Sequence, residues 1–111
     1  MAERNYLGEL ELMILLSVVR LGEEAYGVPI SHEIGKQVGR DVTLGSVYAA
    51  LERMEARGLV ASRLGDSTPE RGGKAKRYFR VTKAGLRQVQ ETRRVLQQMW
   101  RNLPELRGER P

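Results

Sequence analysis

The stretch of 18 residues from Thr43 to Val60 constrains the fold more than any other part of the chain. Its apolar residues recur at three- and four-residue spacing, which predicts a helix with one apolar stripe. Thr43 is placed to cap this helix at its start, and Gly58 can take the left-handed conformation that ends one. Small, hydroxyl and cationic side chains on the other face would let the helix slide deeply into a groove. The predicted stripe is Leu44, Val47, Leu51 and Met54; the outward face is Gly45, Ser46, Ala49, Ala50 and Arg53, with Tyr48 at the boundary.

The composition excludes several classes of functional site. A chain of 111 residues has room for one domain with one modest core. It has no cysteine, which excludes disulfides, thiolate metal sites and cysteine nucleophiles, and is compatible with a reducing cytoplasm. The single histidine, His32, cannot form a metal site unaided. We therefore expect no metal and no cofactor.

Positive charge is concentrated in the second part of the chain. Residues 1–42 hold four basic and seven acidic side chains, whereas residues 43–111 hold fifteen basic and seven acidic ones. Six of the basic residues lie between Arg71 and Lys83, where there is no acid. This pattern favours contact with a polyanion such as DNA, with a generically basic solvated surface as the other interpretation.

Neither a targeting segment nor a membrane span is predicted. No cationic region precedes a cleavable apolar segment, so we expect no signal peptide. The most apolar run, Leu12 to Leu21, is interrupted by Ser17 and Arg20 and is shorter than the roughly 20 residues that a membrane helix needs. A cytoplasmic location without membrane contact is expected.

Three helices are predicted in the first half of the chain. The first, residues 7–21, is apolar around most of its circumference, which predicts burial on two sides, one of them against a second subunit. The second runs from Tyr26 to Gly39, with Pro29 in its first turn. A short connection with a one-rung strand at Val42 leads to the third helix, at about 43–57. This order is typical of a helix-turn-helix.

A β-hairpin is predicted directly after the third helix. Residues 59–64 and 76–82 read as strands, joined by the turn-rich segment Gly65 to Gly73. In the second strand, Phe79 and Val81 are expected to point inward, and Tyr78 and Arg80 outward. A hairpin in this place is the wing of a winged helix, here at about 59–81.

The last predicted helix covers residues 82–103, beginning at Thr82 and stopped by Pro104. Apolar residues seven apart along it indicate a short heptad seam with one charged interruption. A second copy of the chain is the expected partner, together with its first helix. The predicted dimer interface is Leu10, Ile14, Leu86, Val89, Arg93, Leu96, Trp100 and Leu103. Residues 104–111 are expected to be a disordered tail. The fold class is thus mainly α with a small β-hairpin: a winged helix-turn-helix at 7–81 and a C-terminal dimerisation helix.

Three blocks of sequence, in this order and spacing, resemble the PadR family of bacterial transcriptional regulators. They are Tyr26-Gly27, residues 45–60 (GSVYAALERMEARGLV) and residues 72–85 (GGKAKRYFRVTKAG). The resemblance covers about residues 7–103 and points to the compact subclass with a single terminal helix. It implies a homodimer with the third helix in the major groove and the wings on the flanking backbone. Such proteins are mostly repressors relieved by a small aromatic or lipophilic effector.

The resemblance also implies which side chains contact DNA. Ser46 and Tyr48 match the family's hydroxyl and tyrosine near the start of the recognition helix, and Lys74, Lys76 and Tyr78 match its wing. Because Gly45, Ala49 and Ala50 offer little to read bases, discrimination should rest on Ser46, on Ala49 against a thymine methyl, on Arg53 and on DNA shape. The candidate DNA contacts are Thr43, Ser46, Tyr48, Ala49, Arg53, Arg71, Lys74, Lys76, Arg77 and Tyr78.

The predicted function is therefore a sequence-specific dimeric regulator, a repressor that binds an inverted-repeat operator in double-stranded DNA. The alternative is a winged helix used as a protein-interaction or assembly module, which the sparsely furnished third helix favours and the basic wing disfavours. An enzyme is not expected, because the chain has no thiol, no second histidine and no phosphate-cradling glycine loop.

Overall fold

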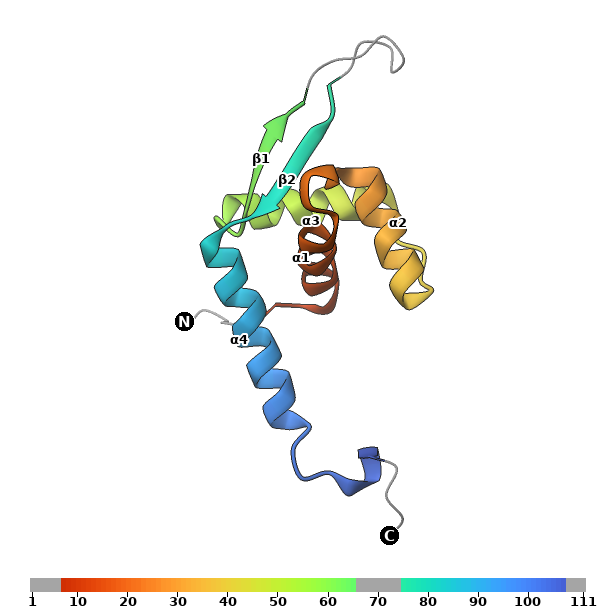
Figure 1. Cartoon of the computed structure of the whole chain (residues 1–111), viewed down its shortest axis with the longest axis vertical. Coiled ribbons are helices and arrows are strands. Elements are labelled where there is room, and N and C mark those ends of the chain that lie inside the picture. The colour runs from red at the N-terminus through yellow and green to blue at the C-terminus, as the bar shows by residue number, and fades with distance from the viewer. Residues whose placement is uncertain (1–6, 66–74, 108–111) are drawn as a thin grey trace.

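The computed structural model describes residues 7–65 and 75–107. Helices α1 and α2 form a compact body with α3, a two-stranded hairpin projects from one end, and α4 leaves from the other (Figure 1). The elements are α1 (Glu9–Leu21), the 3-10 turn η1 (Gly22–Glu24), α2 (Gly27–Val38), α3 (Leu44–Ala56), β1 (Val60–Leu64), β2 (Arg77–Val81), α4 (Lys83–Met99) and the 3-10 turn η3 (Pro104–Arg107). The predicted fold class, a winged helix-turn-helix with a C-terminal helix, is confirmed.

The core lies where α1, α2 and α3 meet. Its largest fully buried apolar side chains are Ile14, Leu15, Ile30, Ile34, Leu51, Met54, Val47 and Val60. Burying a side chain of this size stabilises a fold by about 1.5–3 kcal/mol. Ile14, which the sequence placed at the dimer interface, is fully buried in this core and has no surface left for a partner.

Helix α3 begins and ends as predicted. The hydroxyl of Thr43 accepts the backbone N–H of Ser46 at 3.1 Å, and Gly58 lies beyond the helix with φ +76°. The buried stripe of α3 differs from the predicted one at two positions. Leu44, predicted to be buried, is 40% exposed, and Ala50, predicted to face outward, is fully buried. At 100° per residue, Ala50 and Leu44 flank the arc of Met54, Val47 and Leu51 on opposite sides, and the core covers the side of Ala50 but not that of Leu44.

The two strands of the hairpin are antiparallel, with Val60 opposite Val81 and Leu64 opposite Arg77. Phe79 is buried in the core. Its backbone N–H donates to the carbonyl of Ala25 at 2.8 Å, which attaches β2 to the segment before α2. The one-rung strand predicted at Val42 is wrong, since the carbonyl of Val42 accepts the Ser31 hydroxyl instead, at 2.8 Å. Most of the predicted turn, from residue 66 to 73, lies outside the described residues.

Helix α4 starts in tight contact with the end of α3. The Thr82 hydroxyl accepts the Gly85 N–H at 3.0 Å, as predicted for a cap, and donates to the Gly58 carbonyl at 2.6 Å. A Cβ at Gly85 would lie 2.1 Å from the carbonyl oxygen of Leu59, so only glycine fits there. The backbone N–H of Leu7 donates to the buried Thr92 hydroxyl at 2.7 Å, which joins α4 to the start of the chain.

The C-terminal end differs from the prediction. Helix α4 ends at Met99 rather than near Leu103, and Asn102 has φ +58°, a conformation that no helix continues. Pro104–Arg107 forms a 3-10 turn, so the predicted disordered tail does not begin at residue 104; residues 108–111 lie outside the described part. No helix in residues 7–65 or 75–107 combines the length and apolar character of a membrane span.

Candidate nucleic-acid interface

The exposed face of α3 is lined by short side chains. Gly45, Ala49, Glu52 and Ala56 are all exposed and follow one another at steps of four, three and four residues, which places them on one face. Ser46 and Arg53 are also exposed and lie along one flank of this face. The hydroxyl of Thr43, itself exposed, donates to that of Ser46 at 2.8 Å. The predicted outward positions of Ser46, Ala49 and Arg53 are thus available for contact with a groove.

Glu52 is a further candidate that the sequence interpretation did not include. It lies three residues after Ala49 on the exposed face of α3. A carboxylate at such a position can accept a hydrogen bond from the amino group of cytosine. The spacing of seven residues from Gly45 was the signal that could have identified it.

Tyr48 lies on the other flank and is turned toward the start of α2. A Cβ at Gly27 would lie 2.4 Å from both the Cζ and the hydroxyl oxygen of Tyr48. The half-buried ring therefore covers Gly27, and any larger residue there would displace it. This close approach explains why a glycine follows Tyr26 in this block. It also leaves only the edge of the Tyr48 ring accessible to another molecule.

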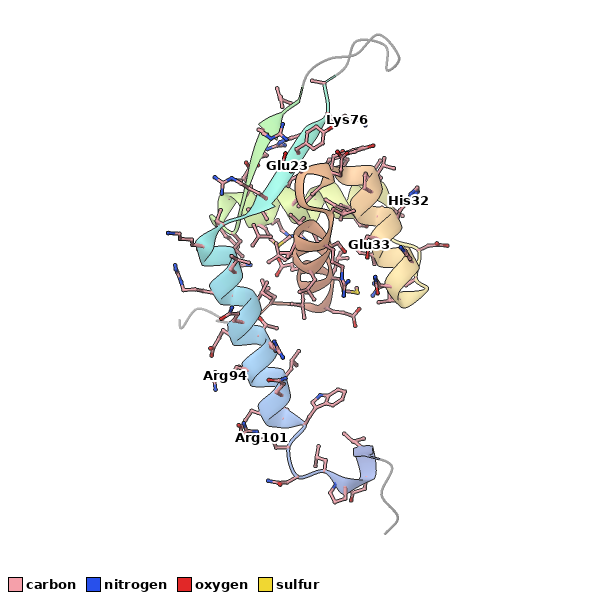
Figure 2. The ribbon with its side chains drawn as sticks, viewed as in Figure 1. Glu23, His32, Glu33, Lys76, Arg94 and Arg101 are labelled. Carbon is pink, nitrogen blue, oxygen red and sulfur yellow. The ribbon has the colours of Figure 1, made fainter. Side chains whose placement is uncertain are left out.

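Aromatic and cationic side chains stack along the outer half of the β1–β2 hairpin, and we call this hairpin the wing. The rings of Tyr26 and Tyr78 meet edge to face, with centroids 5.4 Å apart. The Nζ atom of Lys76 lies 3.8 Å from the centroid of Tyr26, and the guanidinium carbon of Arg63 lies 4.7 Å from that of Tyr78. The expected outward orientation of Tyr78 needs correction, because its ring is half-buried between these groups. Lys76 presents its charge on the side of the wing nearest α2 (Figure 2).

The remaining predicted cations of the wing differ in their surroundings. Arg77 forms an ion pair with Glu55 and donates from Nε to the Ser62 hydroxyl at 3.0 Å. Because its guanidinium is already bound within the chain, we do not keep Arg77 among the proposed DNA contacts. Arg71 and Lys74 lie outside the described residues.

Apolar side chains are exposed on α1 and at the end of α4. Leu16 and Val19 of α1 are 43% and 53% exposed, and Trp100 is 67% exposed at the end of α4. Of the predicted dimer contacts on these helices, Leu86, Arg93 and Leu96 are exposed, whereas Leu10, Val89 and Leu103 are half-buried.

The exposed side of α4 also carries a local ion pair. Arg94 Nη2 lies 2.5 Å from Glu91 Oε1, and this hydrogen bond lowers the pKa of Glu91 and raises that of Arg94. Arg94 on α4 and Arg101 just beyond its end lie in the part of the molecule opposite to Lys76 (Figure 2).

Comparison with known proteins gives one consistent answer. The family model described as the transcriptional regulator PadR-like family matches residues 15–91. The transcriptional regulator Rv3488 of Mycobacterium tuberculosis (strain ATCC 25618 / H37Rv) is 34% identical over 82 residues, which cover 72% of this chain and 70% of that protein.

Solved structures share the fold. A PadR-like transcriptional regulator (BC4206) from Bacillus cereus strain ATCC 14579 superposes with a TM-score of 0.71 at 27% identity, over 91% of this chain and 93% of that one. A PadR family transcription regulator from Clostridium difficile R20291 gives a TM-score of 0.72 at 19% identity, over 91% and 100% of the two chains. The second likeness concerns the fold alone.

Proposed function

This chain belongs to the PadR-like family of transcriptional regulators, and from that premise we propose that it represses transcription as a homodimer on an inverted-repeat operator. Membership implies DNA binding and regulation rather than catalysis. Regulators of this family bind DNA as dimers in general. The operator, the direction of regulation and the effector are parts of the proposal.

The observation that carries the proposal is the exposed face of α3. A helix that offers Gly45 and Ala49 outward can approach the floor of a major groove closely with its N-terminal half, because no long side chain stands between these two positions on that face. Ser46 and Arg53 would then contact base edges, and the methyl of Ala49 would pack against a thymine methyl. Because so few side chains of α3 can contact base edges, the shape of the DNA should supply part of the sequence specificity.

The wing would hold the protein in register. Lys76, whose Nζ lies over the Tyr26 ring, would contact phosphate, and such a contact adds affinity but carries no sequence information. Thr43, at the N-terminus of α3, would donate to a phosphate in place of the Ser46 hydroxyl, while its oxygen still accepts the capping hydrogen bond from the Ser46 N–H. Tyr48 would contribute through its exposed rim.

Pairing of two chains through α4 would set the spacing of the two recognition helices. In such a dimer the half-sites lie about one helical turn of DNA apart. The exposed apolar residues Leu86, Leu96 and Trp100 are the surface that we assign to this contact. Arg93 lies between Leu86 and Leu96 along the helix and would contribute at the rim.

We propose a small aromatic or lipophilic molecule as the effector. The end of α4 holds a hollow of about 570 Å³ lined by Leu96, Gln97, Trp100 and Arg101, within the size range of small-molecule sites. A ligand bound there could release DNA only if it favours one dimer geometry over another.

The test is selection of bound DNA from a random pool, repeated with a library of aromatic compounds. An inverted repeat that is lost with one compound would support every part of the proposal.

Ser46→Ala should change the preferred base beneath α3. Lys76→Gln should lower the slope of log affinity against log salt by about 0.9 per chain, or about 1.8 for a dimer, on any sequence. The control Lys36→Gln removes the same charge from the far end of α2 and should leave that slope unchanged. Binding without any sequence preference would contradict the proposal and favour an interaction module.

A further inference from the structure

Three polar side chains connect the recognition helix to both strands of the wing. Glu55 comes from the last turn of α3, Ser62 from β1 and Arg77 from β2. The Ser62 hydroxyl donates to Glu55 Oε2 at 2.7 Å, Arg77 Nε donates to the Ser62 oxygen at 3.0 Å, and Arg77 Nη2 donates to Glu55 Oε1. These bonds form a closed ring, which we call the Glu55 bridge.

The bridge is stronger than an ordinary surface ion pair. The side chains of Arg77 and Glu55 are 39% and 30% exposed, so solvent screens the pair only in part. Both oxygens of the carboxylate accept from within the chain, and the bonds to charged groups are charge-assisted. The ring also fixes the rotamers of all its members.

The opposite face of the wing is held as well. Side chains alternate along a strand, so Tyr78 points away from the face that carries Arg77. There Tyr78 meets Tyr26, which precedes α2. The outer half of the hairpin is therefore fixed from both faces, by α3 through Glu55 and by the start of α2 through Tyr26.

We propose that Glu55 is a positioning residue for DNA binding: through Ser62 and Arg77 it sets the angle between α3 and the wing, so that both reach one duplex together. This inference rests on the proposed function. Two contacts held at a fixed offset reinforce each other, because once the first forms the second is already at a high effective concentration. A wing free to swing would lose this gain, although each contact could still form alone.

The direction in which Glu55→Gln changes the affinity for DNA distinguishes this positioning role from a purely electrostatic one. Glu55 is a negative charge on the helix that approaches DNA. If it acted only by its charge, or by occupying an arginine that would otherwise bind phosphate, Glu55→Gln would strengthen binding to every DNA. The Glu55 bridge predicts the opposite result on the operator.

The experiment compares Glu55→Gln with Glu24→Gln, which removes the same charge from an exposed position in η1. Affinity is measured for the selected operator and for a scrambled duplex of equal length. Glu55→Gln should weaken operator binding about tenfold, as expected from loss of a charged hydrogen bond, and change binding to scrambled DNA by less than about threefold. Glu24→Gln should bind the operator at least as tightly as the unaltered protein.

A charge exchange provides the rescue. Glu55→Arg alone places two cations together and should weaken operator binding more than Glu55→Gln does. Combining it with Arg77→Glu restores a pair of opposite charges, and Ser62 can still donate to one partner and accept from the other. The double variant has the net charge of the natural chain and should recover most of the lost affinity. A phosphate-contacting Arg77 would not allow this recovery.

The orientation of the wing is measured separately from DNA binding. The chain has no cysteine, so spin labels can be attached at Lys36→Cys and Leu64→Cys, two exposed positions on α2 and at the outer end of β1. Labelled protein is diluted with unlabelled protein so that only distances within one chain are observed. The distance distribution should be narrow, and should broaden with Glu55→Gln while the melting temperature of the body changes little.

The outcomes decide between the possibilities. A broadened distribution with weakened operator binding, both reversed in the exchanged pair, supports the proposal. Operator binding by Glu55→Gln that equals or exceeds that of the unaltered protein overturns it, as does an unchanged distance distribution. If the unaltered protein prefers no DNA sequence, the proposed function fails, and with it the role of the bridge in DNA binding; the distances then still show whether the bridge fixes the wing.

Discussion

The body formed by α1, α2 and α3 buries the apolar side chains at its centre completely, whereas the last turns of α4 expose theirs. Leu51 and Met54 of the body are fully buried, while Met99 of α4 and Trp100 at its C-cap are 70% and 67% exposed. A single chain therefore completes the core of the body but leaves the end of α4 uncovered. Exposed apolar side chains of this size on a projecting helix favour a contact with another molecule.

Helix α4 itself shows where the change occurs. Gly85 and Thr92 are buried against the body, and Val89 packs on its core. The predicted line Val89, Leu96, Leu103 runs beside this docked face, whereas the line Leu86, Arg93, Trp100 is exposed throughout. Of the two predicted seams, the second is exposed at every position, and Leu96 of the first is exposed as well.

The largest expected effect is in the body. Leu51→Ala should lower the free energy of unfolding by about 2–5 kcal/mol, because it leaves a cavity in a fully closed core. Urea denaturation at a fixed protein concentration measures this. Leu96→Ala, the same change on the exposed part of α4, should cost much less in the same experiment. Equal losses would mean that the two regions do not differ as described.

The junction between the two regions should be nearly as sensitive. Gly85→Ala places a Cβ against the carbonyl of Leu59, and relieving this overlap requires α4 to shift. We expect a loss of about 1–3 kcal/mol, typical of overpacking. Gly45→Ala, at an exposed helical position whose added Cβ meets nothing within 4 Å, is the control and should be neutral or slightly stabilising. A neutral Gly85→Ala would show that the contact between α3 and α4 is loose.

An intermediate effect is expected at the exposed end of α4. Trp100→Ser should weaken self-association about tenfold or more, as expected for a buried aromatic anchor in an interface, with little change in the stability of the body. Val38→Ser, an exposed apolar position on α2, should leave association unchanged. Dilution followed by light scattering gives the dissociation constants. The assigned interface would be wrong if Trp100→Ser and Val38→Ser associated equally well.

The smallest effect is expected for the Glu91–Arg94 pair. The hydrogen bond from Arg94 lowers the pKa of Glu91, so its contribution is present above the carboxyl's unfolded pKa and is lost as the pH falls through the folded one. Both groups are at the surface, so Glu91→Gln should leave the melting temperature at neutral pH unchanged. Arg94→Gln should raise the pKa of Glu91 toward its ordinary value in an NMR titration. An unchanged pKa would show that the pair does not persist in solution.

The parts of the fold that local chemistry determines could be predicted from the sequence. The caps at Thr43 and Thr82 and the left-handed Gly58 depend on neighbours within a few residues, and each lies where it was expected. The hydrogen bond from the Phe79 N–H to the Ala25 carbonyl was missed because it depends on β2, more than 50 residues later in the chain. Likewise, when a helix is apolar around most of its circumference, the sequence does not reveal which side faces the core of its own chain. Ile14 was therefore wrongly assigned to the dimer interface.

The sequence predicted which face of α3 is exposed, but it did not predict which side chains of the wing are paired with residues elsewhere in the chain. The spacing in α3 places Ser46, Ala49 and Arg53 outward, as observed. The count of positive charges grouped Arg77 with the other wing cations, yet Glu55, which is 22 residues earlier, reaches it across the fold. Tyr78 differs for a similar reason, since Tyr26 covers it from another element.

The most direct test of the difference between the closed body and the open end of α4 is the mass of the protein in solution, free and on its operator. Equilibrium sedimentation at micromolar concentration should give 25.2 kDa, twice the 12.6 kDa of one chain, and the same two chains on each inverted repeat. A mass of 12.6 kDa at every concentration, with independent binding of single chains to half-sites, would contradict pairing through α4.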